Sequence, residues 1–220
     1  MGFGSIFKNA WNEFFDNVGA ISLFLLLFLV PILVLGIVCV VCVLALIYSS
    51  LILVKVLMVL LLCIVFVLFV GVGVFVNASF YGMKVSSKKY SWRMLVQVGK
   101  SAFWRFLGRG ILLFLCIIGL FLLLIVPGII FSVYWIFAIF IWFDEPKRSF
   151  SDSLRRSKEL VKGKWWNVFG CVLLFCVIEW IIMFILDFVP VLNVVGYLFL
   201  GIFSVYFFRH MYIEYSKRRA

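Results

Sequence analysis

The sequence is short of charged side chains. Of its 220 residues, 13% are charged and 67% are hydrophobic, whereas an average soluble domain is about a quarter charged and roughly half apolar. A water-soluble core cannot absorb such an excess of apolar side chains. The composition therefore excludes an ordinary soluble globular domain and favours an integral membrane protein.

Groups that could catalyse a reaction are equally scarce. The only histidine, His210, stands beside Arg209, where we expect it to solvate a helix terminus. The sequence contains no HExxH, no GxSxG and no glycine-rich phosphate loop. We therefore predict a protein that is not an enzyme and that holds no cofactor and no metal.

Cysteines are present, but a disulfide framework or a zinc site is not expected from them, because all of them lie within apolar stretches. Two have the CxxC spacing, which is a weak redox signal without a soluble βαβ context. We interpret the cysteines as small apolar residues of helices. They are Cys39, Cys42, Cys63, Cys116, Cys171 and Cys176.

Long apolar runs dominate the chain. No charged side chain occurs from Val18 to Val54, and the same holds from Val56 to Tyr81, after Lys55. Because a helix of roughly 20 apolar residues crosses a bilayer, these runs predict transmembrane helices. A barrel strand would instead alternate apolar and polar residues. We predict an all-α membrane protein located in the cytoplasmic membrane.

Polar breaks divide the apolar sequence into three blocks, each too long for one ordinary span. The first block turns near Tyr48-Ser49-Ser50. The third is broken at Asp187 to Pro190, where proline removes a backbone donor. The prediction is six transmembrane helices arranged as three hairpins, with spans 1 and 2 in 18–80, spans 3 and 4 in 110–143 and spans 5 and 6 in 167–213.

The middle block allows a single kinked helix, two short helices that meet at Pro127-Gly128, or a re-entrant hairpin. Charge decides against the single helix, because basic stretches flank the block and Lys and Arg stay cytoplasmic. Each half reaches roughly 25 Å at about 1.5 Å per residue, short of the ~30 Å hydrocarbon core, so the last two alternatives stay open. The flanking basic residues are Lys84, Lys88, Lys89, Arg93, Lys100, Arg105 and Arg109, and then Lys147, Arg148, Arg155, Arg156, Lys158, Lys162 and Lys164.

The same rule orients the whole chain. Of the 20 Lys and Arg residues, 19 fall on the predicted cytoplasmic side and only Lys55 falls near an outer turn. Both termini are then cytoplasmic. A basic tail at 214–220 completes the pattern.

A stretch with amphipathic helical spacing precedes each block. These stretches occupy 1–17, 87–109 and 150–166, and we predict that each forms an interfacial helix. Two aromatic residues and a glycine then open each block. We interpret the interfacial helix, aromatic anchor and hairpin as a unit that is repeated three times. The aromatic motifs are Phe14-Phe15 with Gly19, Phe103-Trp104 with Gly108, and Trp165-Trp166 with Gly170.

Glu179 is an acidic residue in the middle of the fifth predicted span. Because a charge buried in lipid costs at least ~3 kcal/mol, such a residue is a functional candidate by default. It could line a polar path or bind a proton. Alternatively, it is protonated and bonded to a neighbouring helix, or it faces a partner subunit. Lys55 and Asp187 lie nearer the outer interface, where polar side chains reach water.

The three basic, aromatic stretches are the strongest candidates for a binding site. Lys and Arg near a membrane attract anionic lipid at about 1 kcal/mol per charge, and Trp settles at the level of the headgroups. Topology marking explains much of this pattern, and binding of lipid or a protein partner is the further hypothesis. Nucleic acid is not expected, since the membrane accounts for the net charge of +11. The candidate contact residues are Arg93, Lys100, Trp104, Arg105, Arg155, Arg156, Lys158, Lys162, Lys164, Trp165 and Trp166.

The segment from Val126 to Gly170 contains a Val-Pro-Gly start, an acid at 145, a Leu-Arg-Arg-Ser helix and a following glycine. This pattern resembles the membrane domain attached to some glycerophosphodiester phosphodiesterases, which also occurs as stand-alone six-helix proteins. The resemblance implies the fold and the topology. It implies no phosphodiesterase activity, because that activity resides in a separate soluble domain. The matching positions are Pro127, Gly128, Glu145, Leu154, Ser157 and Gly163.

These observations favour a non-enzymatic multi-pass protein. It would organise either lipid with anionic headgroups or a protein partner at the cytoplasmic leaflet. A homo-oligomer is an open possibility for the partner. A transporter or channel-like bundle with a polar path around Glu179 is the alternative. An intramembrane enzyme is the least favoured reading, because few ionisable groups can converge.

Overall fold

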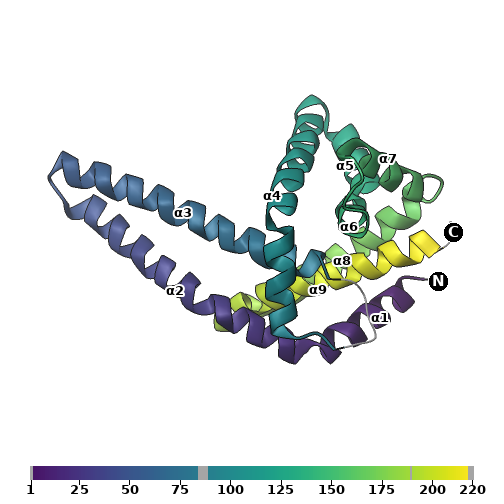
Figure 1. Ribbon diagram of the computed structural model, residues 1–220, viewed down its shortest axis with the longest axis horizontal. Coiled ribbons are helices and arrows are strands. Elements are labelled where there is room, and N and C mark those ends of the chain that lie inside the picture. Colours follow the sequence, from purple (N-terminus) through teal and green to yellow (C-terminus); the bar gives the residue numbers. More distant parts are fainter. Residues whose placement is uncertain (1, 84–88, 189, 218–220) are drawn as a thin grey trace. The chain divides into compact units, whose positions relative to one another are not determined.

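The computed structural model describes residues 2–83, 89–188 and 190–217, without the side chains of 190–194. These residues are mostly helical and contain no strand, so the predicted all-α class is confirmed. Figure 1 shows the order of the helices. They are α1 (Phe3–Asp16), α2 (Val18–Tyr48), α3 (Ile52–Tyr81), α4 (Trp92–Leu123), α5 (Ile125–Trp135), α6 (Ala138–Asp144), α7 (Phe150–Val161), α8 (Trp165–Leu186) and α9 (Pro190–Lys217).

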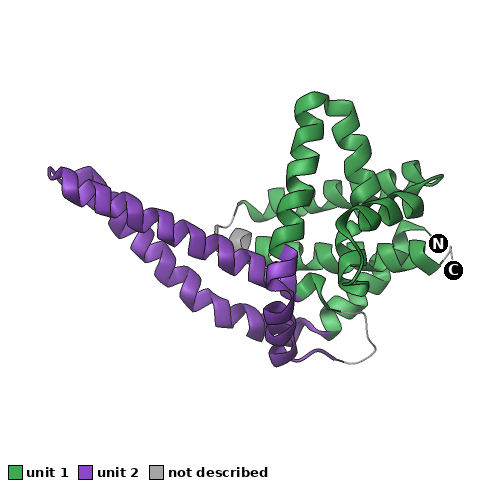
Figure 2. Cartoon of the chain, turned by 45° about the horizontal axis from the view of Figure 1, so that its top comes forward, with its two compact units in different colours: residues 1–16, 80–87, 107–220 green, residues 17–79, 88–106 purple. Residues whose placement is uncertain are grey.

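The chain divides into two compact units, coloured separately in Figure 2. Unit 1 comprises residues 1–16, 80–87 and 107–220, and unit 2 comprises residues 17–79 and 88–106. Unit 2 therefore holds α2, nearly all of α3 and the first half of α4. The remaining helices belong to unit 1.

Unit 2 is built around α2 and α3, which meet at residues 49–51, next to the predicted turn. The backbone N–H of Leu51 donates to Ser49 Oγ (3.2 Å) in this turn. Both helices are apolar on all sides, and none of the residues in the most apolar stretch of α3 is buried. Surfaces of this kind need an apolar solvent, as a lipid bilayer provides.

The first half of α4 packs within unit 2 through its apolar face. Leu95 and Ala102 are buried, and Gly99 lies between them in the amphipathic pattern. A Cβ atom at position 99 would meet the ring of Phe75 at 2.8 Å and would also meet Ser79 Oγ. The missing side chain of Gly99 therefore permits the close approach of α4 and α3.

The structure differs from the prediction of a separate interfacial helix over 87–109, because α4 continues without interruption through residue 110. No proline lies between Trp92 and Leu123, and each of the glycines of α4 costs the helix only about 1 kcal/mol. The helix ends where Leu124 takes an extended conformation (φ −161°, ψ 136°). The break thus precedes the predicted Pro127-Gly128 position, and Pro127 occupies the first turn of α5, where it breaks no helical hydrogen bond.

In unit 1, the predicted fourth span is divided into α5 and α6 by a turn at residues 136 and 137. Helix α6 packs against α4 and α7, with Ala138 and Trp142 buried against Leu113. The ring of Trp142 stacks on that of Phe150 at 5.6 Å, at the start of α7. This aromatic contact fixes α7 to the end of the fourth span.

Helix α7 begins at a regular N-cap, since Ser149 Oγ accepts the backbone N–H of Asp152 (3.2 Å). The helix ends at Val161, so the predicted helix over 150–166 is shorter in the structure. Gly163 has φ +82°, a backbone conformation that residues other than glycine rarely adopt. This residue ends the helical path and allows α8 to start in a new direction at Trp165.

Helices α8 and α9 run antiparallel in unit 1. The ring of Phe175 stacks on Phe207 at 4.2 Å, and Lys164, just before α8, lies over the ring of Tyr215 near the end of α9. Helix α8 ends at Leu186 and α9 begins at Pro190, a residue suited to the first turn of a helix.

The apolar face of α1 packs on α9. Ile6, Ala10 and Phe14 are buried, and Phe14 meets Phe203 edge to face at 5.6 Å. The faces predicted to lie in the membrane interface, those of α1, α7 and the first half of α4, thus pack against other helices of their own unit.

Five helical segments of the described chain are long and apolar enough to cross a membrane, which confirms the expectation of several apolar helices of membrane-spanning length. They are α2, α3, α4, α5 together with α6, and α8. The sixth predicted span, in α9, is not among these segments of the described residues, which leave out the side chains of 190–194. The six-span arrangement therefore stays a prediction.

Candidate functional site

A buried ion pair joins α6 to α9 in unit 1. Arg209 Nη2 donates to Asp144 Oδ1 at 2.7 Å, and the Tyr212 hydroxyl donates to the same carboxylate. The guanidinium of Arg209 also lies over the rings of Phe140 (5.5 Å) and Tyr212 (5.6 Å). Only 7% of Arg209 is exposed, so its charge is held by this pair and by aromatic faces.

A second polar contact joins α1 to α9. His210 Nε2 lies 2.6 Å from Glu13 Oε2, and both side chains are largely buried. The sequence predicted His210 as a solvated helix end, and the structure instead places it against an acid from the first helix. No sequence pattern links residues so far apart, which explains why this partner was missed.

Ser157, one of the positions of the family resemblance, stabilises the turn between α5 and α6. Its hydroxyl donates to the Tyr134 carbonyl (2.7 Å) and accepts the backbone N–H of Phe137 (3.2 Å). Both bonds satisfy backbone groups that a helix break would leave unpaired. Ser157 therefore has a structural role in the fourth span.

The other positions of the resemblance also serve local structure. Gly128 is buried, and a Cβ there would meet the ring of Phe121 at 2.7 Å, so glycine permits α5 to return along α4. Glu145 Oε2 accepts from Arg148 Nε at 2.7 Å in the loop before α7. Leu154 packs against the cluster of Leu113, Ala138 and Trp142, and Pro127 and Gly163 shape the helix ends described above.

The predicted contact residues fall into two groups that belong to different units. In unit 2, the guanidinium of Arg93 lies over the ring of Trp92 at 5.4 Å. Trp104 is 77% exposed, and Arg105 donates to the Ser101 carbonyl of its own helix. Lys100 is also exposed.

The second group lies on α7 and at the start of α8, in unit 1. Arg155 is paired loosely with Asp152 (3.5 Å) and Glu159 (4.0 Å), and Arg156 with Glu159 (3.6 Å). Exposed pairs of this kind contribute about 1 kcal/mol or less, so the guanidinium groups can exchange these partners for others. The ammonium of Lys158 lies over the ring of Phe131 at 5.6 Å.

Two adjacent tryptophans after Gly163 have different surroundings. Trp165 Nε1 donates to the Ile130 carbonyl (3.2 Å), and its ring stacks on Phe169 at 5.0 Å. Trp166 is 76% exposed. Trp165 therefore anchors α8 to α5, whereas Trp166 remains on the surface beside Lys162 and Lys164.

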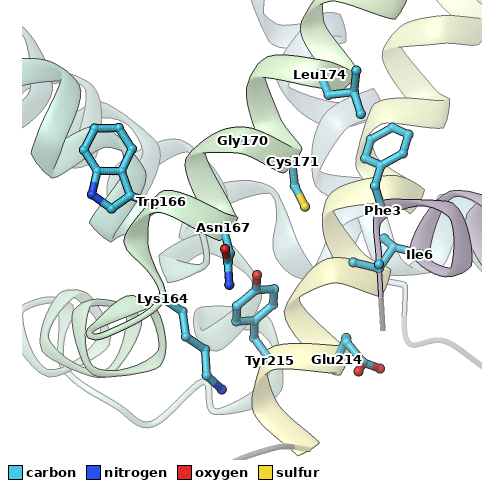
Figure 3. Close-up of a pocket in the computed structure, with 11 residues that line it drawn as sticks. Phe3, Ile6, Lys164, Trp166, Asn167, Gly170, Cys171, Leu174, Glu214 and Tyr215 are labelled. Atoms are coloured by element: carbon cyan, nitrogen blue, oxygen red, sulfur yellow. The ribbon is translucent and has the colours of Figure 1, made fainter.

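A cavity of about 470 Å³ lies beside Trp166, between the start of α1, the start of α8 and the end of α9. A second cavity of about 440 Å³ is also lined by Trp166, together with Trp165 and residues of α5. Sequence analysis missed both cavities, because each is formed by helices that are far apart in the chain. Figure 3 shows the first cavity and its lining residues.

No family model, no curated protein and no solved structure matches this chain. The resemblance of residues 126–170 accordingly stays a prediction that rests on those residues alone. The contacts of the chain itself are what support a function.

Glu179 lies on α8 and is partly exposed. It has no hydrogen bond and no ion pair with any residue that the structure describes, and it lines neither cavity. Its neighbours Cys176 and Trp180 are exposed. Within unit 1, the structure therefore does not bring Glu179 into a polar path.

Proposed function

We propose that this chain is a multi-pass protein of the cytoplasmic membrane that crosses the bilayer six times, as three helical hairpins, with both termini in the cytoplasm. Its basic helices bind anionic lipid headgroups, or a protein partner, at the cytoplasmic leaflet. The protein carries out this role without enzymatic chemistry.

Contacts in the second half of α9 support six crossings. His210 contacts Glu13 of α1, and Arg209 contacts Asp144, at the end of the fourth predicted span. In the six-span arrangement, an even number of spans separates any two of these residues along the chain. All of them therefore lie on the same side of the membrane. The end of α9 must return to the side of α1 to make these contacts, and a full crossing by α9 achieves this.

The lipid hypothesis is supported by the exposed surface of α7 and by the exposed Trp166. The apolar face of α7 is used for packing, because Ser153, Ser157 and Leu160 are buried, and its basic face is left outward. Arg155 is 73% exposed there. Exposed cations and an exposed tryptophan are both suited to the headgroup region of the membrane surface.

The test compares two triple variants in nanodiscs of zwitterionic lipid. Arg155, Arg156 and Lys158 are replaced by Gln in one, and Lys8, Lys147 and Lys217 in the other, so that the same charge is removed from different places. Co-sedimentation with anionic liposomes at low salt measures binding. We expect the first variant to bind about tenfold more weakly. Each lost charge removes ~1 kcal/mol of attraction to anionic lipid, and this loss is reduced because Asp152 and Glu159 already neutralise part of the charge.

An equal loss in both variants would show that only net charge matters, and unchanged binding would remove the lipid form of the proposal. The partner form then predicts that the same α7 variant loses a protein that co-purifies with the native chain.

A transport function is the second candidate, and one observation favours it. Glu179 is ionisable, lies within a predicted span and has no ion-pair partner among the described residues. Such a residue gains from a partner outside its own helix, such as water in a pathway or a second subunit.

A further inference from the structure

The cavity beside Trp166 has a polar end and an apolar end. In Figure 3, Lys164 and Glu214 lie on either side of Tyr215 at one end, and Phe3 and Leu174 lie at the other. The amide of Asn167 lies between the two ends. A site built in this way matches an amphiphile, whose charged group and hydrocarbon must both be accommodated.

The polar end holds charges of both signs. Lys164 and Asn167 make no side-chain hydrogen bond and no ion pair with the residues that the structure describes, so both can donate to a ligand. The carboxylate of Glu214 stands across Tyr215 from Lys164. Lys164 attracts a phosphate, and Glu214 attracts an ammonium that can donate hydrogen bonds. A ligand with two negative charges would be repelled by Glu214.

The volume of the cavity is also informative. It is about 470 Å³. This space is within the usual range of ligand sites and is suited to a lipid headgroup with the first carbons of its chains. It cannot enclose a whole lipid, whose chains would leave past Leu174 into the surrounding bilayer.

We propose that this cavity binds one zwitterionic aminophospholipid, with its phosphate on Lys164 and Asn167, its ammonium near Glu214 and its chains beside Phe3 and Leu174. The inference deepens the proposed function by naming a lipid class and a built site. It rests on that function for one point, namely that Lys164 and Trp166 lie at the cytoplasmic surface of the membrane.

The experiment uses the full chain in detergent micelles and phosphatidylethanolamine with a photoreactive group in one acyl chain. The yield of cross-linked protein measures occupancy, and peptide mass spectrometry locates the cross-link. We expect cross-links on α1 near Phe3 and on α8 near Leu174. Phosphatidylglycerol with the same photoreactive chain should give a yield about tenfold lower, which is about 1.4 kcal/mol at 25 °C.

Two pairs of variants separate the cavity from its surroundings. Lys164→Gln should lower the yield about tenfold, the loss of one charge-assisted contact, whereas Lys162→Gln, which removes the same charge two residues away, should leave it unchanged. Gly170→Leu should block the cavity, because position 170 lines it and a Cβ there meets nothing within 4 Å. Gly201→Leu, on α9 and equally unobstructed, is its control.

Equal effects of the two lysine variants, with no effect of Gly170→Leu, would overturn the site and leave the proposed attraction of α7 for anionic lipid untouched. Equal yields with the two lipids would overturn the headgroup class. If millimolar O-phosphoethanolamine displaced the lipid, the ligand would be the free headgroup compound and not a lipid. Persistence of the cross-link would support a lipid as the ligand. Loss of binding by the α7 triple variant, with cross-linking intact, would in turn separate the two proposals.

Discussion

Arg209 and Asp144 are 65 residues apart in the chain, and Arg209 Nη2 lies 2.7 Å from Asp144 Oδ1. The pair joins the end of α6 to the second half of α9, and Tyr212 adds a hydrogen bond to the same carboxylate. Because Arg209 is 7% exposed, water cannot replace Asp144 if the partner is lost. The contact therefore determines whether α9 stays against the rest of unit 1.

Removing the cation from this pair should destabilise the protein strongly. Arg209→Met keeps the length of the side chain but leaves the Asp144 carboxylate without its charge partner, at a cost of about 3 kcal/mol. We expect the midpoint of thermal unfolding in detergent to fall by about 6–12 °C. The double variant with Asp144→Leu should recover more than half of this loss, and strictly additive effects would show that the two residues do not interact.

The Ser157 hydroxyl should contribute more stability than that of Ser153, although both residues are completely buried on α7. Ser157 bonds to two backbone groups of the turn between α5 and α6, whereas Ser153 donates to the carbonyl of Ser149, the N-cap of its own helix. Ser157→Ala leaves the Phe137 N–H unpaired at a cost of about 1–3 kcal/mol. Ser153→Ala should cost less than about 1 kcal/mol, since it leaves no polar group of another helix without a hydrogen bond. Thermal unfolding of the two variants in the same detergent distinguishes them, and equal losses would contradict this role of Ser157.

Two glycine-to-alanine changes on α4 should have opposite signs. Gly99→Ala places a methyl group against Phe75 and Ser79, and overpacking of this kind costs about 1–3 kcal/mol. Gly108→Ala meets nothing within 4 Å and should stabilise the helix by about 0.5–1 kcal/mol. Adding Ser79→Ala to Gly99→Ala should recover part of the loss. The free energy of unfolding in denaturant checks all of these variants, and a stabilising Gly99→Ala would mean that α3 and α4 are not in close contact.

The sequence predicts the apolar helices well, because a bilayer selects length and hydrophobicity, and both can be read from local composition. Val18–Tyr48 and Ile52–Tyr81 illustrate this, since neither carries a charge except Lys55. The break before α5 was harder to place. Proline marks a helix start as readily as a helix end, and Pro127 lies in the first turn of α5.

The packing of the amphipathic helices could not be predicted from their periodicity alone. An apolar face on α1 fits a membrane surface as well as it fits another helix. The choice depends on Phe203 and Phe207, which are distant in the sequence. The cavity residues share this property, because Phe3, Lys164 and Glu214 come from three distant segments of the chain. The basic and aromatic residues Lys164 and Trp166 did indicate the surface beside the cavity. They did not indicate that a cavity lies next to it.

The transport alternative predicts that Glu179 is needed for solute or proton movement. Glu179→Gln keeps the shape of the side chain and removes its charge, so flux into proteoliposomes should fall about tenfold or more if the carboxylate carries protons. Under the favoured function, the variant should bind anionic liposomes as the native chain does. Loss of cross-linking between two copies of the chain would instead assign Glu179 to a subunit contact.

The six-span arrangement predicts which positions a membrane-impermeant thiol reagent can reach in intact cells. In a chain with its own cysteines replaced by Ser or Ala, single cysteines at Ser91, Arg155 and Ser216 should react only after permeabilisation, since all three lie on the cytoplasmic side. Ser50→Cys should react in intact cells. Leu124→Cys decides how the middle block crosses, because a complete crossing exposes the turn between α4 and α5 outside, and a re-entrant hairpin keeps it within the bilayer. Labelling of Ser216→Cys in intact cells would mean that α9 does not cross, and labelling of Arg155→Cys there would contradict the shared cytoplasmic location of the basic helices.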